Sequence, residues 1–342
     1  MNIEIDPPLW PAHRTLWSHL VSTQSLAQLH GFAFAQGIPA RAFDGDHYDV
    51  PAEQHDELVA AGALPVPAHQ LVRDLRACSL RLTAGVRVRR LTDLRTRWAT
   101  LAPTGEVGPS AGDLGSNKGE SWAMAESWAR VGEELLVRWR ERGRLHHGLP
   151  HLVEVLEAID RLASAEQLSE ADLRRARLAA WFHDAVHSSG LSAAAREAHN
   201  AEPKHPSDEA ASADLVRNLL PTDPDADRVA ARVLMTQTHQ SAPGDLAAAV
   251  LSDADLSVLG SSPQRYADYA AAIRAEYAHI PDSHFRPGRA TILEALVAGE
   301  LFATPSGNQW WDAAARANLT AEISALRVVP SAAPNVPADG ED

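Results

Sequence analysis

The chain has 342 residues, of which 45% are hydrophobic and 22% charged, and its net charge is −14. This length suits two domains. The acidic balance argues against a nucleic-acid backbone as the main partner, because binding phosphates requires a basic face. The single cysteine, Cys78, excludes an internal disulfide framework and a thiolate zinc cluster.

The composition also bears on location and on metal chemistry. The first residues, MNIEIDPPLW, lack the basic-then-apolar layout of a signal peptide. No apolar stretch is long enough to cross a bilayer. We therefore expect a cytoplasmic protein without a membrane partner. The 16 histidines are many for this length, so any bound metal would be held by imidazole and carboxylate groups.

The first segment, residues 1–82, is predicted to be a small α/β unit, because strands and helices alternate along it. Ser25 is suited to the N-cap of a helix and Gly37 to its C-terminal stop. In chain order the expected elements are a strand at Asn2–Asp6, a helix at Ser25–Gln36, a strand at Ile38–Phe43, and helices at Pro51–Ala61 and Pro67–Leu80.

The loops of this unit are rich in polar and aromatic side chains, which is typical of functional loops and also of surface turns. They include Asp6, Trp10, His13, Trp17, Ser18, His19, Asp44, Asp46, His47, Tyr48 and Asp49. The pattern IDPPLWPAH, WSHLVS, SLAQLH and RAFDGDHYDVP resembles a small bacterial domain family of unknown activity. The resemblance therefore implies no function for this unit.

Residues 83–119 are expected to link two domains. Their second half, from Ala102 onwards, is rich in glycine and proline and has no apolar period. Their first half carries five arginines, which could hold a phosphate or an acidic partner but fit a solvated boundary or an acid-paired face better. These arginines are Arg87, Arg89, Arg90, Arg95 and Arg97.

Residues 120–327 are predicted to form an all-α domain, because helical periodicity continues without an alternating strand pattern. The expected helices are Glu120–Arg142, Leu152–Leu162, Glu170–His187, Ser207–Leu220, Asp225–His239, Asp245–Leu259, Pro263–Tyr277, Arg289–Phe302 and Trp311–Leu326. The remaining tail, residues 328–342, is rich in proline, alanine and aspartate and is expected to be disordered.

The stretch LAAWFHDAVH, residues 178–187, places His183 and Asp184 directly after an apolar run. Neighbouring helix positions point about 100° apart, so one ion could lie between the two side chains. Ionisable groups in a core are costly unless they are paired or metal-bound. For this dipeptide alone, a hydrogen-bonded His–Asp pair is the alternative interpretation.

Other segments extend this pattern. HHGLPHLVEVL contains His147 and His151, TQTHQ contains His239, and LSDADLSVLG contains two aspartates. In order, these histidines and aspartates resemble the HD superfamily of metal-dependent phosphohydrolases, over residues 120–327. Within that superfamily the chain is most similar to a bacterial branch of predicted phosphohydrolases, a resemblance that SDEAASADL, YAAAIRAEY and FRPGRATILEAL also carry.

The resemblance implies the metal ligands His151, His183, Asp184 and Asp255. His147 is the alternative to His151 or an additional ligand, and Asp253 is the alternative to Asp255. His187 stands where the family pattern has an aromatic residue, and a contact behind the ligands suits it better than ligation. Such ligands suit Mn, Fe, Co, Ni, Zn or Mg, with one ion or two.

Further candidates surround these ligands. Asp184 could also orient or deprotonate an attacking water, and Glu209 and His239 are candidate acid–base groups. Arg274 and Arg289 are candidate phosphate ligands, whereas a salt bridge suits Arg286 better. The alternative role for Glu209 is helix-dipole complementation in a first turn. For His239 the alternative is a capping or core position. For the arginines it is a salt bridge with Glu276 or another acid.

These observations predict a metal-dependent phosphohydrolase that acts on a phosphate ester or anhydride of a small molecule, by family analogy a nucleotide. A metal-containing nucleotide sensor without turnover is the first alternative. The second assigns the chemistry to Asp6, His13, His19, Asp46 and His47 of the N-terminal unit. The oligomeric state stays open, with a homo-oligomer among the options.

Overall fold

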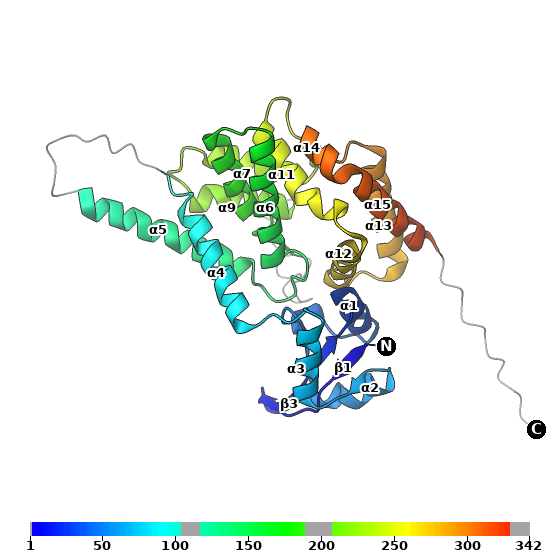
Figure 1. Ribbon diagram of the computed structural model, residues 1–342. Coiled ribbons are helices and arrows are strands. Elements are labelled where there is room, and N and C mark those ends of the chain that lie inside the picture. The colour runs from blue at the N-terminus through cyan, green and yellow to red at the C-terminus, as the bar shows by residue number, and fades with distance from the viewer. Residues whose placement is uncertain (1, 104–116, 189–206, 329–342) are drawn as a thin grey trace, which may run out of the picture.

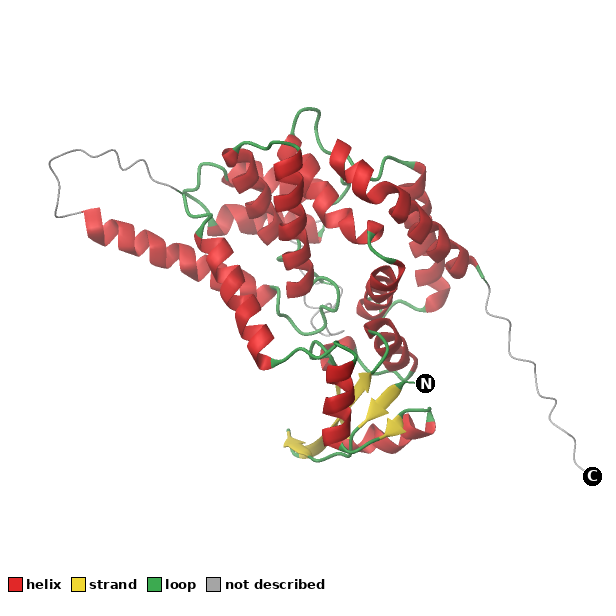
Figure 2. Cartoon of the chain, in the orientation of Figure 1, coloured by secondary structure: helices red, strands yellow, loops and turns green. Residues whose placement is uncertain are grey.

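The computed structural model describes residues 2–103, 117–188 and 207–328, and it contains a small α/β unit followed by a helical domain (Figures 1 and 2). The predicted fold class is therefore confirmed. Of the predicted tail, residues 328–342, all but Val328 lie outside the described residues, as does segment 104–116 of the predicted linker.

The N-terminal sheet is built around one long strand. β3 (Thr15–Ser22) pairs antiparallel with β1 (Ile3–Ile5), β2 (Trp10–Ala12) and β4 (Tyr48–Pro51), while β5 (Leu64–Pro65) runs parallel to β1. Asn2–Asp6 was correctly expected to contain a strand. The strand predicted at Ile38–Phe43 is wrong, because this segment contains a 3-10 turn at Ala40–Ala42.

Helices cover both faces of this sheet. Leu20 packs with Leu29 of α1 (Leu26–Ala35), whereas Val21 packs with Leu71 of α3 (Ala68–Ala77). This division follows from the strand geometry, since neighbouring side chains point to opposite faces. α1 begins at the expected Ser25 cap and ends before Gly37, which has φ +70°. The short helix α2 spans His55–Ala60.

The arginine-rich segment forms a helix where a linker was expected. α4 (Ala84–Ala99) packs against α5 (Asn117–Arg138). The rings of Trp98 and Trp128 stack at 4.6 Å, and each indole N–H donates to the other residue's carbonyl. A Cβ on Gly132 would lie 2.4 Å from the Trp98 ring, so a glycine permits this close approach. Residues 84–99 thus belong to the helical domain.

The other helices form two packed groups. The first contains α6 (Leu149–Ala165), α7 (Glu170–Phe182), α9 (Asp208–Leu219), α10 (Ala226–Met235) and α11 (Leu246–Leu256). The second contains α12 (Pro263–Glu276), α13 (Asp282–Ala298) and α15 (Ala313–Arg327). The one-turn helix α14 (Pro305–Gly307) contacts α6. α13 starts at Asp282, about two turns before the expected Arg289. Its early start includes Pro287, which lies inside the helix.

The two domains meet where α1 lies against α12 (Figure 1). The backbone N–H of Ala27 donates to Asp268 at 2.7 Å, and the guanidinium of Arg274 lies 4.1 Å from the centre of the Phe34 ring. None of the described helices is both long and apolar enough to span a membrane.

The N-terminal core predicts a pH-dependent stability. His30 is 2% exposed, its Nδ1 lies 2.8 Å from the Tyr48 hydroxyl, and burial lowers its pKa to about 4. Between pH 6.5 and 4 the unfolded chain binds a proton that the folded chain does not. The free energy of unfolding therefore falls as the pH is lowered through this window, by up to about 1.4 kcal/mol per pH unit.

Urea denaturation between pH 4 and 7 measures this slope. His30→Gln should reduce the slope, whereas the same change at the exposed His69 should leave it as in the wild type. An identical slope in the wild type and in His30→Gln would contradict the prediction.

Candidate metal centre

Three helix ends bring four ionisable side chains together. His151 lies in the first turn of α6, His183 caps the C-terminus of α7, and Asp184 follows in a turn. Asp255 lies in the last turn of α11. The pair His183–Asp184 was expected inside a helix, but α7 ends at Phe182, so both side chains project from a helix end.

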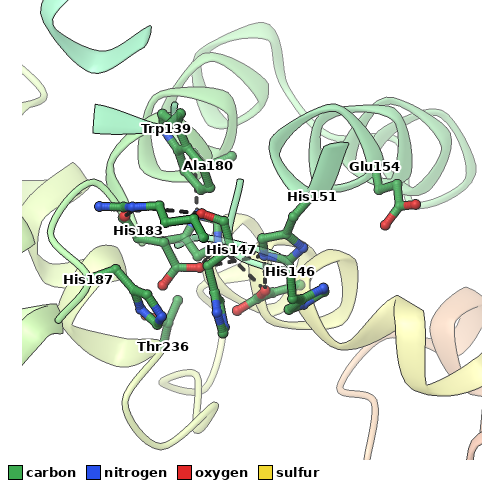
Figure 3. Close-up of polar contacts among 12 residues, drawn as sticks. Trp139, His146, His147, His151, Glu154, Ala180, His183, His187 and Thr236 are labelled. Atoms are coloured by element: carbon green, nitrogen blue, oxygen red, sulfur yellow. Dashed lines mark hydrogen bonds and ion pairs between the residues drawn. The ribbon is translucent and has the colours of Figure 1, made fainter. Parts of the chain in front are cut away.

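The two carboxylates lie beside the imidazole rings of His151 and His183, which are labelled in Figure 3. The Nε2 atoms of His151 and His183 are 3.2 Å apart. Asp255 Oδ1 lies 3.1 Å from Nε2 of His151 and 3.5 Å from that of His183. The corresponding distances from Asp184 Oδ2 are 3.6 and 3.2 Å. The fold thus brings His151 into contact with His183, which lies 32 residues later in the chain, and with Asp255.

A backbone carbonyl sets the orientation of His183. Its Nδ1 lies 2.8 Å from the carbonyl oxygen of Ala180. Because a carbonyl can only accept a hydrogen bond, Nδ1 carries a proton, and the lone pair of the neutral ring is left on Nε2. This nitrogen points into the cluster, as expected for a metal-binding histidine whose other nitrogen donates to an outer partner.

The imidazoles are more deeply buried than the carboxylates: the side chains of His151 and His183 are 2% and 1% exposed, against 20% for Asp184 and 17% for Asp255. Burial alone would lower the pKa of both histidines. The two carboxylates outweigh it, raising the pKa of His151 to about 9 and that of His183 well above its usual value. Conversely, the histidines outweigh burial and hold the carboxyl pKa values of Asp184 and Asp255 well below their usual range.

A loop before α6 is fixed behind this cluster. Glu276 of α12 is 3% exposed, and its Oε1 accepts N–H groups from Leu145, His146 and His147. The guanidinium of Arg144 donates to the carbonyl of Asp184 at 2.5 Å and to that of Ala185 at 3.2 Å. These contacts connect the loop, the end of α7 and α12.

Trp139 and Glu276 were not identified as site residues from the sequence, and neither was Arg144. The indole of Trp139 donates to the carbonyl of Trp181 and its ring packs 5.4 Å from that of His183. A signal existed for Glu276, an acidic residue in the apolar segment YAAAIRAEY. Trp139 and Arg144 carried no such signal, since their roles depend on partners about 40 residues away.

Asp253 and Asp255 point in different directions. Asp253 is fully buried and accepts hydrogen bonds from the backbone N–H groups of Ala303 and Thr304 and from the Thr304 hydroxyl. Its carboxylate therefore anchors the start of α14, and burial raises its pKa. Two positions along a helix separate the side chains by about 200°, so only Asp255 joins the cluster.

His147 belongs to a neighbouring group. Its Nδ1 lies 2.6 Å from Oε2 of Glu276, and Nε2 of His187 lies 3.6 Å from the same oxygen. The rings of His147 and His187 are 4.0 Å apart. These three residues could hold an ion of their own. His147 is therefore placed beside the four-residue cluster and outside it.

His239 lies at the edge of the cluster, with its Nε2 3.8 Å from Oδ2 of Asp255. Its backbone has φ +55°, which is unfavourable for a residue with a Cβ. Glu209 lies in the first turn of α9. Within the described residues, it makes no hydrogen bond or ion pair with the four cluster residues.

The candidate phosphate-binding arginines are engaged elsewhere. Arg274 pairs with Asp282 and donates to the carbonyls of Tyr277 and Ile280, which caps the end of α12. Arg289 pairs with Glu322 and Tyr269. Arg286 donates to three backbone carbonyls at the C-terminal end of α15, and the described residues include no salt bridge for it. The sequence had offered Glu276 as a partner for such arginines, but Glu276 binds His147.

Comparison with known proteins gives a match for the first domain. A family model described as a protein of unknown function (DUF4031) matches residues 3–78. The match covers the α/β unit and does not reach the helical domain. No curated protein and no solved structure matches the chain.

Because Asp253 and Asp255 point in different directions, we expect their substitution to have different effects. Asp255→Asn should remove a ligand and lower the metal content of the purified protein. Asp253→Asn should retain the metal but reduce the free energy of unfolding by about 1–3 kcal/mol, because it disturbs a buried hydrogen-bonded carboxylate. Metal analysis and chemical denaturation measure both effects. Metal loss in Asp253→Asn with retention in Asp255→Asn would reverse the assignment.

Proposed function

We propose that the helical domain is a metal-dependent phosphohydrolase of the HD type, with His151, His183, Asp184 and Asp255 as metal ligands. The observation that carries the proposal is the position of two carboxylates beside two imidazole nitrogens. The Nε2 atoms of His151 and His183 are 3.2 Å apart, and each carboxylate has an oxygen within 3.1–3.6 Å of both of them. These residues follow the order His, His-Asp, Asp along the chain, at the ends of three helices, and this is the order that the HD resemblance implies.

The donor set fits a divalent cation. Two ligands that lie about 2.1 Å from one ion are separated by about 3.0–3.4 Å in octahedral or tetrahedral geometry. The distances in the cluster are close to these values. With neutral imidazoles the cluster carries two negative charges, which a divalent cation would balance. Mixed imidazole and carboxylate ligands suit Mn, Fe, Co, Ni, Zn or Mg, and the adjacent His147 group leaves room for a second ion.

When bound, such a cation would lower the pKa of a coordinated water and offset charge on a phosphoryl group. The protein contributes the surrounding arrangement. Asp184 and Asp255 are the more exposed members of the cluster, so they face the side from which a substrate can approach. Asp184 is positioned to orient water or accept its proton. His239 and His147 flank the carboxylates and could contact phosphoryl oxygens.

The substrate class that we propose is a phosphate ester or anhydride of a small molecule, most specifically a nucleotide. The reaction type rests on the ligand set, and the nucleotide on resemblance to the HD superfamily. No serine or cysteine nucleophile is required, because water attacks directly. Glu209 stays a candidate acid–base group.

A nucleotide sensor without turnover is the second candidate, and one cavity favours it. This cavity, of about 610 Å³, lies between the two domains. Its lining includes Asp49 of the first domain and Arg90, Arg140 and Arg265 of the second, and none of the four cluster residues. An anionic ligand there would contact both domains without reaching the proposed metal.

The experiment that tests the enzyme hypothesis uses two His-Asp pairs of this chain. His183→Ala/Asp184→Ala removes the buried pair. His55→Ala/Asp56→Ala removes a second pair at the start of α2, where Asp56 is fully exposed. Both variants and the wild type are assayed for phosphate release from a nucleotide panel with added manganese, and for metal content.

We expect phosphate release to fall at least about 100-fold in the His183/Asp184 variant, because loss of metal removes several kcal/mol of transition-state stabilisation. The His55/Asp56 control should retain both metal and activity. Metal without turnover in the wild type would favour the sensor. Equal metal and activity in all three proteins would refute the proposed centre.

A further inference from the structure

The N-terminal domain contains a group of side chains that the proposed function does not use. His19 lies on β3 and Asp49 lies directly opposite on the antiparallel strand β4. His47 immediately precedes β4. Because paired residues of neighbouring strands project from the same face of a sheet, His19 and Asp49 share one side of it. The two histidine rings are 4.9 Å apart, edge to face.

Each histidine is held by its own buried aspartate. Nδ1 of His19 lies 3.0 Å from Oδ2 of Asp6, and Nδ1 of His47 lies 2.6 Å from Oδ1 of Asp46. The side chains of Asp6 and Asp46 are 1% and 0% exposed. The carboxylate is an acceptor in both pairs, so Nδ1 is the donor and Nε2 is turned away from it.

The two aspartates are themselves fixed. Asp6 also accepts the backbone N–H of His19 at 2.5 Å and the indole N–H of Trp10 at 3.1 Å. Asp46 also accepts the backbone N–H of Leu82 at 2.6 Å. These additional contacts hold each carboxylate in place beside its histidine.

Both outward nitrogens face Asp49. Its Oδ1 lies 3.5 Å from Nε2 of His47 and 4.0 Å from Nε2 of His19. Two ligands of a tetrahedral ion at about 2.1 Å are about 3.4 Å apart, so these separations leave space for an ion between the three atoms. A direct hydrogen bond would be shorter than either distance.

We propose that His19, His47 and Asp49 form a second site for a divalent transition-metal ion. Two imidazoles and one carboxylate suit such ions, and three protein ligands leave further coordination positions open. Asp6 and Asp46 orient the imidazoles, as carboxylates behind metal-binding histidines do. His19 is 26% and Asp49 34% exposed, so the site is accessible. This proposal is independent of the function proposed for the helical domain.

The location gives the site a chemical context. Asp49 also lines the cavity between the two domains, together with Arg90, Arg140 and Arg142. An ion bound to Asp49 would therefore lie at the border of a cavity whose opposite wall belongs to the helical domain. An anionic small molecule in the cavity could reach the open coordination positions.

The test is the cobalt stoichiometry of the full-length protein, measured by equilibrium dialysis and metal analysis. The main variant is His19→Ala/His47→Ala. The control, His55→Ala/His69→Ala, removes two other histidines from the same domain. A third protein, His183→Ala/Asp184→Ala, removes the centre in the helical domain. Circular dichroism and thermal melting monitor the fold of each.

We expect His19→Ala/His47→Ala to bind one cobalt ion fewer per chain than the wild type and the control. The His183/Asp184 variant should retain that ion. Asp49→Asn, which preserves size, should weaken cobalt binding at this site at least about tenfold, the lower limit for losing even an outer partner.

Several results would overturn the proposal. One is the same cobalt stoichiometry in His19→Ala/His47→Ala as in the wild type, and another is an equal loss in the control. If the double variant fails to fold, Asp49→Asn decides, and unchanged cobalt affinity in that variant refutes the site. Because the helical centre is measured separately in the same series, failure of one site is distinguishable from failure of the other.

Discussion

The arrangement of the helical domain depends on four buried or half-buried ionisable side chains that compensate one another. His151 and His183 lie in the interior beside Trp139, and without partners they would be costly to bury. The carboxylates of Asp184 and Asp255 supply the opposite charges. This compensation requires the start of α6 to meet the C-terminal ends of α7 and α11, so the electrostatics and the packing of the three helices constrain each other.

Glu276 extends this constraint to the rest of the molecule. Its carboxylate holds the loop at residues 145–147 through three backbone N–H groups and also pairs with His147. The helix that carries it, α12, lies against α1 of the N-terminal domain. A single buried acid therefore connects the loop before α6 with the helix at the domain interface.

The two proposed centres share one physical device. In each, an acceptor behind a histidine fixes Nδ1 and turns Nε2 toward a carboxylate. For His183 the acceptor is a backbone carbonyl at the end of a helix, and for His19 and His47 it is a buried aspartate. The helical centre is built from helix ends, whereas the N-terminal one is built from a cross-strand pair. The cavity between the domains is bordered by Asp49, which links the second centre to the interface.

Much of the local structure was determined by the sequence alone. Ser25 and Gly37 bounded α1 correctly, and the 3.6-residue period located most helices of the second domain, because caps and apolar periodicity act over a few residues. The same locality explains the failures. The strand β3 contains Trp17 and His19 among its apolar residues and was taken for a loop, and α4 was taken for a linker because its contact with Trp128 depends on a distant helix.

The sequence proposed a set of metal ligands but left two choices open. Tertiary structure separated them: Asp255 faces His151, whereas Asp253 binds Thr304, and His147 pairs with Glu276. It likewise showed that Arg274 and Arg289 are paired away from the cluster and that His19, His47 and Asp49 converge. Residue types and spacings determine which chemistry a chain carries. Which side chains meet depends on long-range packing. On α11, Asp255 faces the cluster, whereas Asp253, two positions earlier, points to the loop before α14.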